Sequence, residues 1–287
     1  MRYAADFNDY QLLDSSSGEK LEKFGDITLI RPDPQIIWKS ERNEALWKKA
    51  DAKYFRSREG GGSWEFYKKI PTEWKIKYED ITFIIRPTGF KHTGIFPEQA
   101  VNWRYMMDKV KNAKRPVTAL NLFAYTGGAT LALASAGAKV THVDTSKGIV
   151  SWARENAAAS GLSDKPIRWI VDDCKKFIER EIRRGNKYDV IVLDPPSYGR
   201  GPTGEVFKLE DQIYDLLGLL SQLLSDEPLF LLLNSYTTGL GPAVMAYLLN
   251  ETVAKGRKAK VSAEEIGIPV RNTEKILPCG NTAICEF

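Results

Sequence analysis

ALNLFAYTGG, at residues 119–128, is the stretch that decides the fold. An apolar strand over 117–123 leads into a turn with two glycines, and a helix is expected to follow. Two related stretches come later, KVTHVD at 139–144 and VIVLDPPSY at 190–198. Strands this apolar are buried on both faces, which is typical of a parallel sheet covered by helices. The sequence therefore predicts an α/β protein with a Rossmann-like, mostly parallel sheet of seven strands.

Strands and helices alternate from residue 92 onward, and 92–287 is expected to form one domain. The expected helices are 97–113, 128–136, 146–160, 174–184, 209–224 and 242–255. The expected parallel strands are 117–123, 139–143, 167–171, 188–193 and 229–234. Residues 260–287 show no strong helix and are expected to add two strands, antiparallel, at the sheet edge.

Residues 1–91 have a different pattern and are expected to form a small α+β module. Its expected elements are strands at 10–13 and 27–31 that form a hairpin around the polar stretch SSSGEK, a helix at 43–52, and a second hairpin of 74–78 and 82–86. The run EGGGS at 59–63 is expected to interrupt any regular element and to be mobile.

The composition is that of an ordinary globular protein. The 287 residues carry a net charge of +4, which permits an acidic partner such as RNA without requiring one. Cys174, Cys279 and Cys285 are too few and too scattered for a disulfide framework, and no metal-binding spacing is present. No apolar run is long enough to span a bilayer. We therefore expect a cytoplasmic protein without metal, whose oligomeric state the sequence leaves open.

The turn at 125–128 is expected to form the floor of a ligand pocket. Ligands of open α/β sheets lie beyond the carboxyl ends of the strands, and Gly127 and Gly128 let a backbone approach a ligand closely. The alternative is a plain turn that needs glycine for its geometry. Asp144 ends the next strand, where a carboxylate can accept hydrogen bonds from both hydroxyls of an adenosyl ribose, or partly cap the following helix. Asp172 and Asp173 repeat this position one strand over, and one of them could bind the adenine amino group while the other caps a helix.

The kind of ligand follows from two patterns that this chain lacks. A dinucleotide is usually held over GxGxxG, and a nucleoside triphosphate over GxxxxGK[ST], and neither spacing occurs here. A ligand with an adenosyl group, no phosphate and a cationic sulfonium fits better, because nearby carboxylates favour a cation. S-adenosylmethionine (SAM) is therefore the predicted cofactor.

The segment Asp194-Pro195-Pro196-Ser197-Tyr198 is expected to line the same pocket on the side where the substrate reacts. The two prolines fix the backbone and remove two donors, so the turn presents carbonyls and a carboxylate to an incoming N–H or O–H group. Tyr198 can stack on a base, and Arg200 and Lys208 are the expected phosphate contacts. The alternative is a stiff loop with an exposed aromatic ring. His142 falls within a buried strand and is interpreted as a core residue.

With these residues assembled, the chain resembles the class I SAM-dependent methyltransferases that modify large-subunit ribosomal RNA. The matching pieces are HTGIFPEQAVNWR at 92–104, LNLFAYTGG at 120–128, VDTS at 143–146, DDC at 172–174 and DPPSYGRG at 194–201. The resemblance implies that Phe96 and Gln99 lie near the methionine end of the cofactor. It also implies that Asp194 and Pro195 face the target base. Many relatives begin with an RNA-binding β-barrel, which this chain is expected to lack.

The residues predicted for the site fall into three groups. The cofactor-binding group is Phe96, Gln99, Phe123, Ala124, Tyr125, Thr126, Gly127, Gly128, Asp144, Thr145, Ser146, Asp172, Asp173 and Asp194. The catalytic group is Asp194, Pro195, Pro196 and Tyr198, and the substrate-binding group is Tyr198, Arg200 and Lys208.

The predicted reaction is methyl transfer from SAM to a base of structured RNA, ribosomal RNA in particular. Methylation of cytosine C5 requires a cysteine nucleophile, and the relevant strand end reads NSYTT at 234–238, so a nitrogen is favoured and an oxygen stays open as the target atom. Two alternatives stay open. One is a methyltransferase for a protein or a small molecule, and the other is a module that binds SAM or RNA without turnover.

Overall fold

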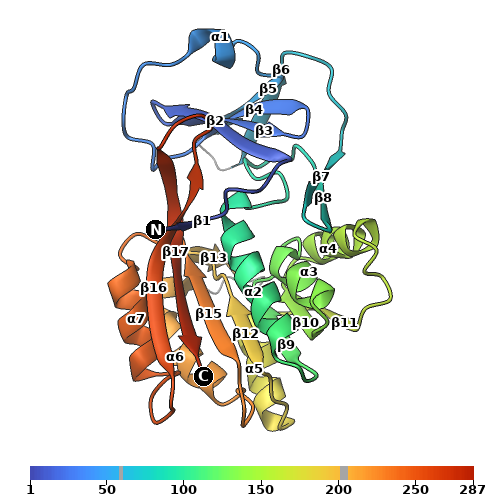
Figure 1. Cartoon of the computed structure of the whole chain (residues 1–287), viewed down its shortest axis with the longest axis vertical. Coiled ribbons are helices and arrows are strands. Elements are labelled where there is room, and N and C mark those ends of the chain that lie inside the picture. The colour runs from blue at the N-terminus through green and yellow to red at the C-terminus, as the bar shows by residue number, and fades with distance from the viewer. Residues whose placement is uncertain (58–60, 201–205) are drawn as a thin grey trace. The chain divides into compact units, whose positions relative to one another are not determined.

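The computed structural model describes residues 1–57, 61–200 and 206–287, and its contacts divide the chain into two units (Figure 1). The larger unit comprises Met1–Arg2, Asn102–Ile266 and Gly280–Phe287. The smaller unit comprises Tyr3–Val101 and Gly267–Cys279. By these contacts residues 92–101 and 267–279 lie in the smaller unit, whereas the sequence assigned them to the second domain.

The larger unit is built on an eight-stranded sheet in the order β1-β16-β17-β15-β12-β9-β10-β11. The strand bounds are β1 Arg2–Tyr3, β9 Thr118–Leu122, β10 Lys139–Asp144, β11 Ile167–Val171, β12 Val190–Leu193, β15 Phe230–Ser235, β16 Lys260–Pro269 and β17 Ile276–Glu286. Strands β15, β12, β9, β10 and β11 are parallel, and β17 runs antiparallel to β15. The mostly parallel sheet with an antiparallel addition is thus confirmed, and the two-residue strand β1 is an unpredicted eighth member.

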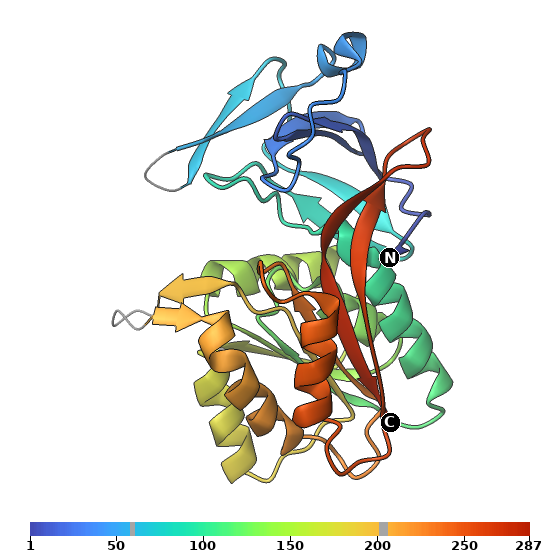
Figure 2. The same cartoon turned by 90° about the vertical axis from the view of Figure 1, so that its left-hand side faces the viewer.

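Helices cover both faces of this sheet (Figures 1 and 2). Their bounds are α2 Ala100–Asn112, α3 Gly128–Ser135, α4 Lys147–Ala159, α5 Cys174–Arg183, α6 Leu209–Ser221 and α7 Pro242–Glu251. Alternate residues of each strand face opposite helix layers, as pleating requires. Leu120 and Leu122 pack with α5, α6 and α7, whereas Ala119 packs with α2 and α3. All six predicted helices are therefore present. None of the helices in the described part of the chain is long and apolar enough to cross a membrane.

The smaller unit holds a five-stranded sheet in the order β2-β3-β4-β5-β6 and a separate hairpin of β7 and β8. The bounds are β2 Tyr10–Ser16, β3 Glu19–Phe24, β4 Ile27–Pro32, β5 Ala52–Arg56, β6 Gly62–Phe66, β7 Trp74–Tyr78 and β8 Ile81–Ile85. The hairpin predicted at 74–78 and 82–86 is confirmed. Of the run 59–63, residues 59 and 60 lie outside the described part, and β6 begins at Gly62.

The hairpin predicted around SSSGEK is wrong. Strand β2 pairs with β3, which contains part of that polar stretch, and β4 pairs with the other side of β3. Ser17 and Gly18 form the tight turn, with φ of 53° and 81°, the conformation favoured in two-residue hairpins. The extra strand escaped prediction because its inward-facing Glu22 is charged. That side chain is buried against Arg31, which completes an ion pair inside the sheet.

The helix predicted at 43–52 is also wrong in extent. Only α1, Glu44–Trp47, is helical, with the Asn43 side chain accepting a hydrogen bond from Leu46 N. The chain then returns to the sheet because Asp51 is bonded twice to Thr28. Its backbone N donates to Thr28 O at 2.7 Å, and its Oδ2 accepts from Thr28 N at 2.7 Å. Strand β5 follows directly.

A short hairpin, which was not predicted, follows the proline-containing segment after β12. It consists of β13 Tyr198–Arg200 and β14 Val206–Lys208, in antiparallel register. Figure 2 shows it extending away from the helices of the larger unit. Gly201, the end of the motif DPPSYGRG, lies outside the described residues.

Candidate active site

The strand order of the larger unit reverses between β9 and β12, and the predicted residues gather beyond the carboxyl ends there. The two neighbours of β9 leave the sheet at matched positions, since Leu122 is aligned with Val143 of β10 and with Leu193 of β12. In an open α/β sheet this crevice is where ligands bind. The segments that border it are 123–128, 144–146, 172–173 and 194–198.

The turn after β9 has an unusual backbone. Phe123, Tyr125 and Gly127 have φ of 54°, 49° and 91°, so three alternate residues are left-handed, two of them not glycine. Such residues cost about 1 kcal/mol each and cluster at functional sites. Phe123 N donates to Cys174 Sγ at 3.4 Å, and Tyr125 N donates to Asp144 Oδ2 at 3.0 Å. The turn is therefore held by bonds to the ends of neighbouring elements.

The two glycines of the turn have a packing reason within the protein. A Cβ on Gly128 would lie 2.7 Å from Cζ2 of Trp103 on α2, and one on Gly127 would lie 3.2 Å from Cβ of Ala153 on α4. Thr126 is buried, and its carbonyl accepts a hydrogen bond from Asn156 Nδ2 at 3.0 Å. Packing against α2 and α4 therefore gives both glycines a structural reason that needs no ligand.

Asp144 ties this turn to the next helix. Its Oδ2 accepts from Tyr125 N, and its Oδ1 accepts from Ser146 N at 2.9 Å. Ser146 itself is the N-cap of α4, with its Oγ accepting from Ile149 N, and Thr145 between them is exposed. A carboxylate has about four acceptor positions, so each oxygen retains one after these bonds. Asp144 is thus oriented by the backbone and still able to accept two hydrogen bonds from a ligand.

The acids after β11 divide their roles. Asp173 is the N-cap of α5, and its Oδ1 accepts from Lys176 N at 2.9 Å. Asp172 accepts from Asp173 N at 2.9 Å and forms an ion pair with Arg180. The capping role that the sequence assigned to one of the two acids therefore belongs to Asp173.

Asp194 follows β12, which lies beside β9 on the side away from β10. Its Oδ1 accepts a hydrogen bond from Asn234 Nδ2 of β15 at 3.0 Å. Pro195 is buried and Pro196 exposed. The bond to Asn234 was missed from the sequence, although a polar residue at the end of the apolar strand FLLLNS is the kind of signal that marks a strand-end site.

The predicted substrate residues lie on the β13–β14 hairpin. Tyr198 is 50% exposed and directly opposite the exposed Lys208. Arg200 ends β13 opposite Val206, and only its backbone is described. An exposed ring beside an exposed cation can meet a base and a phosphate, respectively.

The comparisons with known proteins decide the family. Residues 53–265 match the S-adenosylmethionine-dependent methyltransferases. The chain belongs to this family. A SAM-dependent methyltransferase from Agrobacterium tumefaciens is 38% identical, with a TM-score of 0.93 over 99% of this chain and 92% of that one. The family assignment makes SAM the cofactor of the present chain, as the sequence predicted.

Two other relatives are informative. The ribosomal RNA large subunit methyltransferase K/L of Shewanella sp. strain MR-4 is 35% identical over 159 residues, which are 54% of this chain. The match spans only 21% of that protein. A SAM-dependent methyltransferase structure from Streptococcus mutans has a TM-score of 0.76 at 17% identity, over 97% of this chain and 75% of that one, and shares the fold.

The residues of the larger unit fit SAM in one specific respect. Asp144 offers two oriented acceptors next to a turn that offers close backbone approach, and SAM presents a ribose diol and a cationic sulfonium. When bound, SAM supplies the methyl group on its sulfonium. The residues predicted to hold it remain predictions, residue by residue.

Replacing Asp144 by alanine is expected to weaken SAM binding by about 1.5–3 kcal/mol, the range for hydrogen bonds to a charged group. Isothermal titration calorimetry with SAM measures this as a Kd raised roughly tenfold to a hundredfold. Asp108→Ala, an exposed aspartate on α2, is the matched control and should leave the Kd unchanged. An unchanged Kd in Asp144→Ala would show that the ribose is held elsewhere.

Phe96 and Gln99 belong to the smaller unit. Phe96 precedes the 3₁₀ turn η1, Pro97–Gln99, and its ring centroid lies 4.9 Å from that of His92. Gln99 is buried. Their part in binding the cofactor stays a prediction from the resemblance.

The histidine and cysteine residues of the larger unit are structural. His142 is fully buried, with Nδ1 2.9 Å from Thr130 Oγ1, and burial lowers its pKa to about 3. It is thus the neutral core residue that the sequence predicted. Burial raises the pKa of Cys174, which packs beneath the turn, so its thiol is protonated and unsuited to nucleophilic attack.

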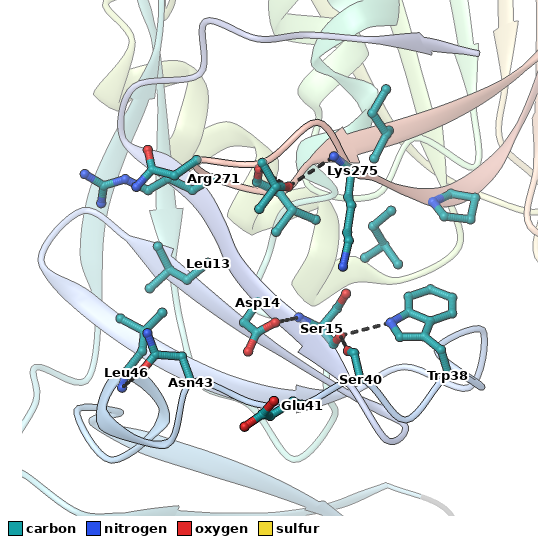
Figure 3. Close-up of a pocket in the computed structure, with 16 residues that line it drawn as sticks. Leu13, Asp14, Ser15, Trp38, Ser40, Glu41, Asn43, Leu46, Arg271 and Lys275 are labelled. Atoms are coloured by element: carbon teal, nitrogen blue, oxygen red, sulfur yellow. Dashed lines mark hydrogen bonds between the residues drawn. The ribbon is translucent and has the colours of Figure 1, made fainter.

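A separate cavity of about 820 Å³ lies within the smaller unit (Figure 3). Its walls include Trp38, whose Nε1 donates to Ser15 O at 2.9 Å, and Glu41. Lys275 extends its side chain toward Ser15. None of the lining residues is a predicted site residue of this methyltransferase, so the cavity is not the cofactor site argued from the strand ends.

Proposed function

We propose that this methyltransferase modifies a base of structured RNA, ribosomal RNA in particular, at a nitrogen atom. The observation that carries the proposal is the segment after β12. Asp194 is held there by Asn234, and Tyr198 and Lys208 lie exposed on the hairpin that follows. The relative from Shewanella, named a ribosomal RNA large subunit methyltransferase, supports RNA as the substrate class. A protein that modifies such an RNA is expected to act in the cytoplasm.

The chain's part in the reaction is alignment. Asn234 Nδ2 donates to one oxygen of Asp194 and so orients the carboxylate, which accepts an N–H of the incoming base. A fixed acceptor holds the nitrogen lone pair in line with the methyl group, and positioning of this kind supplies about 7–11 kcal/mol at best. Proline at 195 and 196 removes backbone donors that would compete for the carboxylate. As the amine gains positive charge, the same carboxylate stabilises it.

Nitrogen is favoured over carbon because no thiol is placed for the chemistry that carbon requires. C5 of a pyrimidine becomes nucleophilic only after a cysteine attacks C6. β15 ends in Asn234 and Ser235, where such a cysteine would stand in this sheet. The three cysteines of the chain are all buried, and burial raises the pKa of each.

The deciding experiment supplies labelled SAM and the full-length protein to total RNA from a strain that lacks the protein. We expect label in ribosomal RNA, and in an N-methylated nucleoside after digestion. RNA from the parent strain, already methylated at the site, is the control and should accept little label. Label in the protein fraction or in small molecules would favour the methyltransferase alternatives. SAM binding without label in any fraction would favour a binding module.

A further inference from the structure

A line of four hydrogen bonds runs through the larger unit and ends at Asp194. Arg2 Nη1 donates to Asn102 Oδ1 at 3.2 Å, and Asn102 Nδ2 donates to Thr282 Oγ1 at 2.9 Å. Thr282 Oγ1 donates to Asn234 Oδ1 at 2.8 Å, and Asn234 Nδ2 donates to Asp194 Oδ1 at 3.0 Å. The five residues come from five different elements of the chain: β1, α2, β17, β15 and the segment after β12.

The middle of this line is sealed from water. Asn102, Thr282 and Asn234 are 0%, 1% and 1% exposed. A buried amide or hydroxyl that loses its partner cannot turn to solvent instead, and each such loss is destabilising. The three side chains therefore constrain one another's orientation.

The line has a single direction, and Arg2 sets it. A guanidinium can only donate, so Asn102 must present its oxygen to Arg2 and its amino group to Thr282. The Thr282 oxygen then accepts from Asn102, and its proton is left to donate to Asn234 Oδ1. Asn234 consequently turns its amino group toward Asp194. With the amide reversed, an oxygen would face the carboxylate and repel it.

We propose that Asn102 and Thr282 are positioning residues for methyl transfer, which act on Asp194 through the amide of Asn234. By fixing a donor on one oxygen of Asp194, they set the orientation in which this carboxylate accepts from the substrate. The substrate group that this arrangement selects is an N–H donor, such as an amino or imino group of a base. The inference rests on the proposed role of Asp194 in the reaction.

The test compares two substitutions at Thr282 in the full-length protein. Thr282→Val keeps the shape of a β-branched residue and removes the hydroxyl, and Thr282→Ser keeps the hydroxyl. With labelled SAM and total RNA from a strain lacking the protein, we expect kcat to fall about tenfold in Thr282→Val. The KM for SAM should be unchanged. Thr282→Ser should recover kcat to within about twofold, because the line is restored.

Thr141→Val is the matched control. It removes another buried hydroxyl of the same unit, one that is bonded to Tyr188 and not part of the line. Its kcat should match that of the wild type. If Thr282→Val keeps the wild-type kcat, or if Thr282→Ser is as slow as Thr282→Val, the inference is wrong.

Two further variants keep the outcome interpretable. If Thr282→Val does not fold, Arg2→Met breaks the line at the end opposite Asp194, and kcat should fall about threefold with unchanged SAM affinity. A wild-type kcat in that variant would overturn the inference. If Asp194→Ala itself transfers methyl groups at the wild-type rate, the proposed role of Asp194 is wrong. If Asp194→Ala is slow but the variants of the line are not, only the inference about Asn102 and Thr282 is wrong.

Discussion

The Asp194→Ala variant is expected to bind SAM with nearly wild-type affinity and to transfer methyl groups about a hundredfold to a thousandfold more slowly. The structure gives the reason for the separation. Asp194 is anchored through Asn234 of β15, whereas the bonds that shape the turn after β9, where SAM is predicted to bind, come from Asp144 and Cys174. Removing the carboxylate deprives the substrate of its acceptor and leaves that turn intact.

Two measurements check this prediction. Calorimetry gives the SAM affinity, and label transfer to RNA from the strain lacking the protein gives the rate. Asp215→Ala, an exposed aspartate of α6, is the matched control and should behave as the wild type in both. A parallel loss of SAM affinity and rate in Asp194→Ala would show that the residue supports the fold rather than the reaction.

The sheet of the larger unit could be predicted because burial on both faces leaves a clear signal. Stretches such as VIVL and FLLL contain no polar residue that could face water, so only a covered parallel sheet accommodates them. The position of Asp144 and Asp194 at strand ends follows from that pattern, since parallel strands finish at one edge. The antiparallel addition of β16 and β17 was expected for another reason, because residues 260–287 show no strong helix that could make a crossover.

Two features were not predictable because they depend on side-chain contacts that exist only in the folded protein. Asn234 reads as an ordinary polar residue after a strand until Thr282, 48 residues later, is seen to orient it. Strand β3 reads as a polar loop until the charge on Glu22 is seen to be paired with Arg31. A single sequence shows that a charged residue is present and does not show whether it is neutralised.

That ion pair leads to the largest expected effect on stability. Glu22 is fully buried, and its Oε2 and Oε1 accept from Arg31 Nε and Nη2, both at 2.7 Å. Tyr10 Oη donates to Oε1 at 2.7 Å. In Glu22→Gln the guanidinium of Arg31 stays buried without its counter-charge. Breaking a buried pair in this way costs about 3–5 kcal/mol.

Chemical denaturation at neutral pH measures this loss, with hydrogen exchange of the β3 amides reporting on the smaller unit. Glu73→Gln is the matched control, because it makes the same change in the same unit at an exposed pair with Arg86. It should cost less than about 1 kcal/mol. Equal losses in the two variants would mean that burial adds nothing to the Glu22 pair.

The pH dependence gives an independent check of the same pair. Burial by itself raises the pKa of Glu22, but the charges of Arg31 and Lys20 and the hydrogen bonds it accepts outweigh burial, and the pKa is about 2 instead of 4.5. Because the folded-state pKa is depressed, the stabilisation is complete above about pH 4.5 and is lost as the pH falls toward 2. Protonated Glu22 resembles glutamine in charge and shape. The difference in unfolding free energy between wild type and Glu22→Gln should therefore shrink across this range, and a difference that stays constant down to pH 2 would contradict the assigned ionisation.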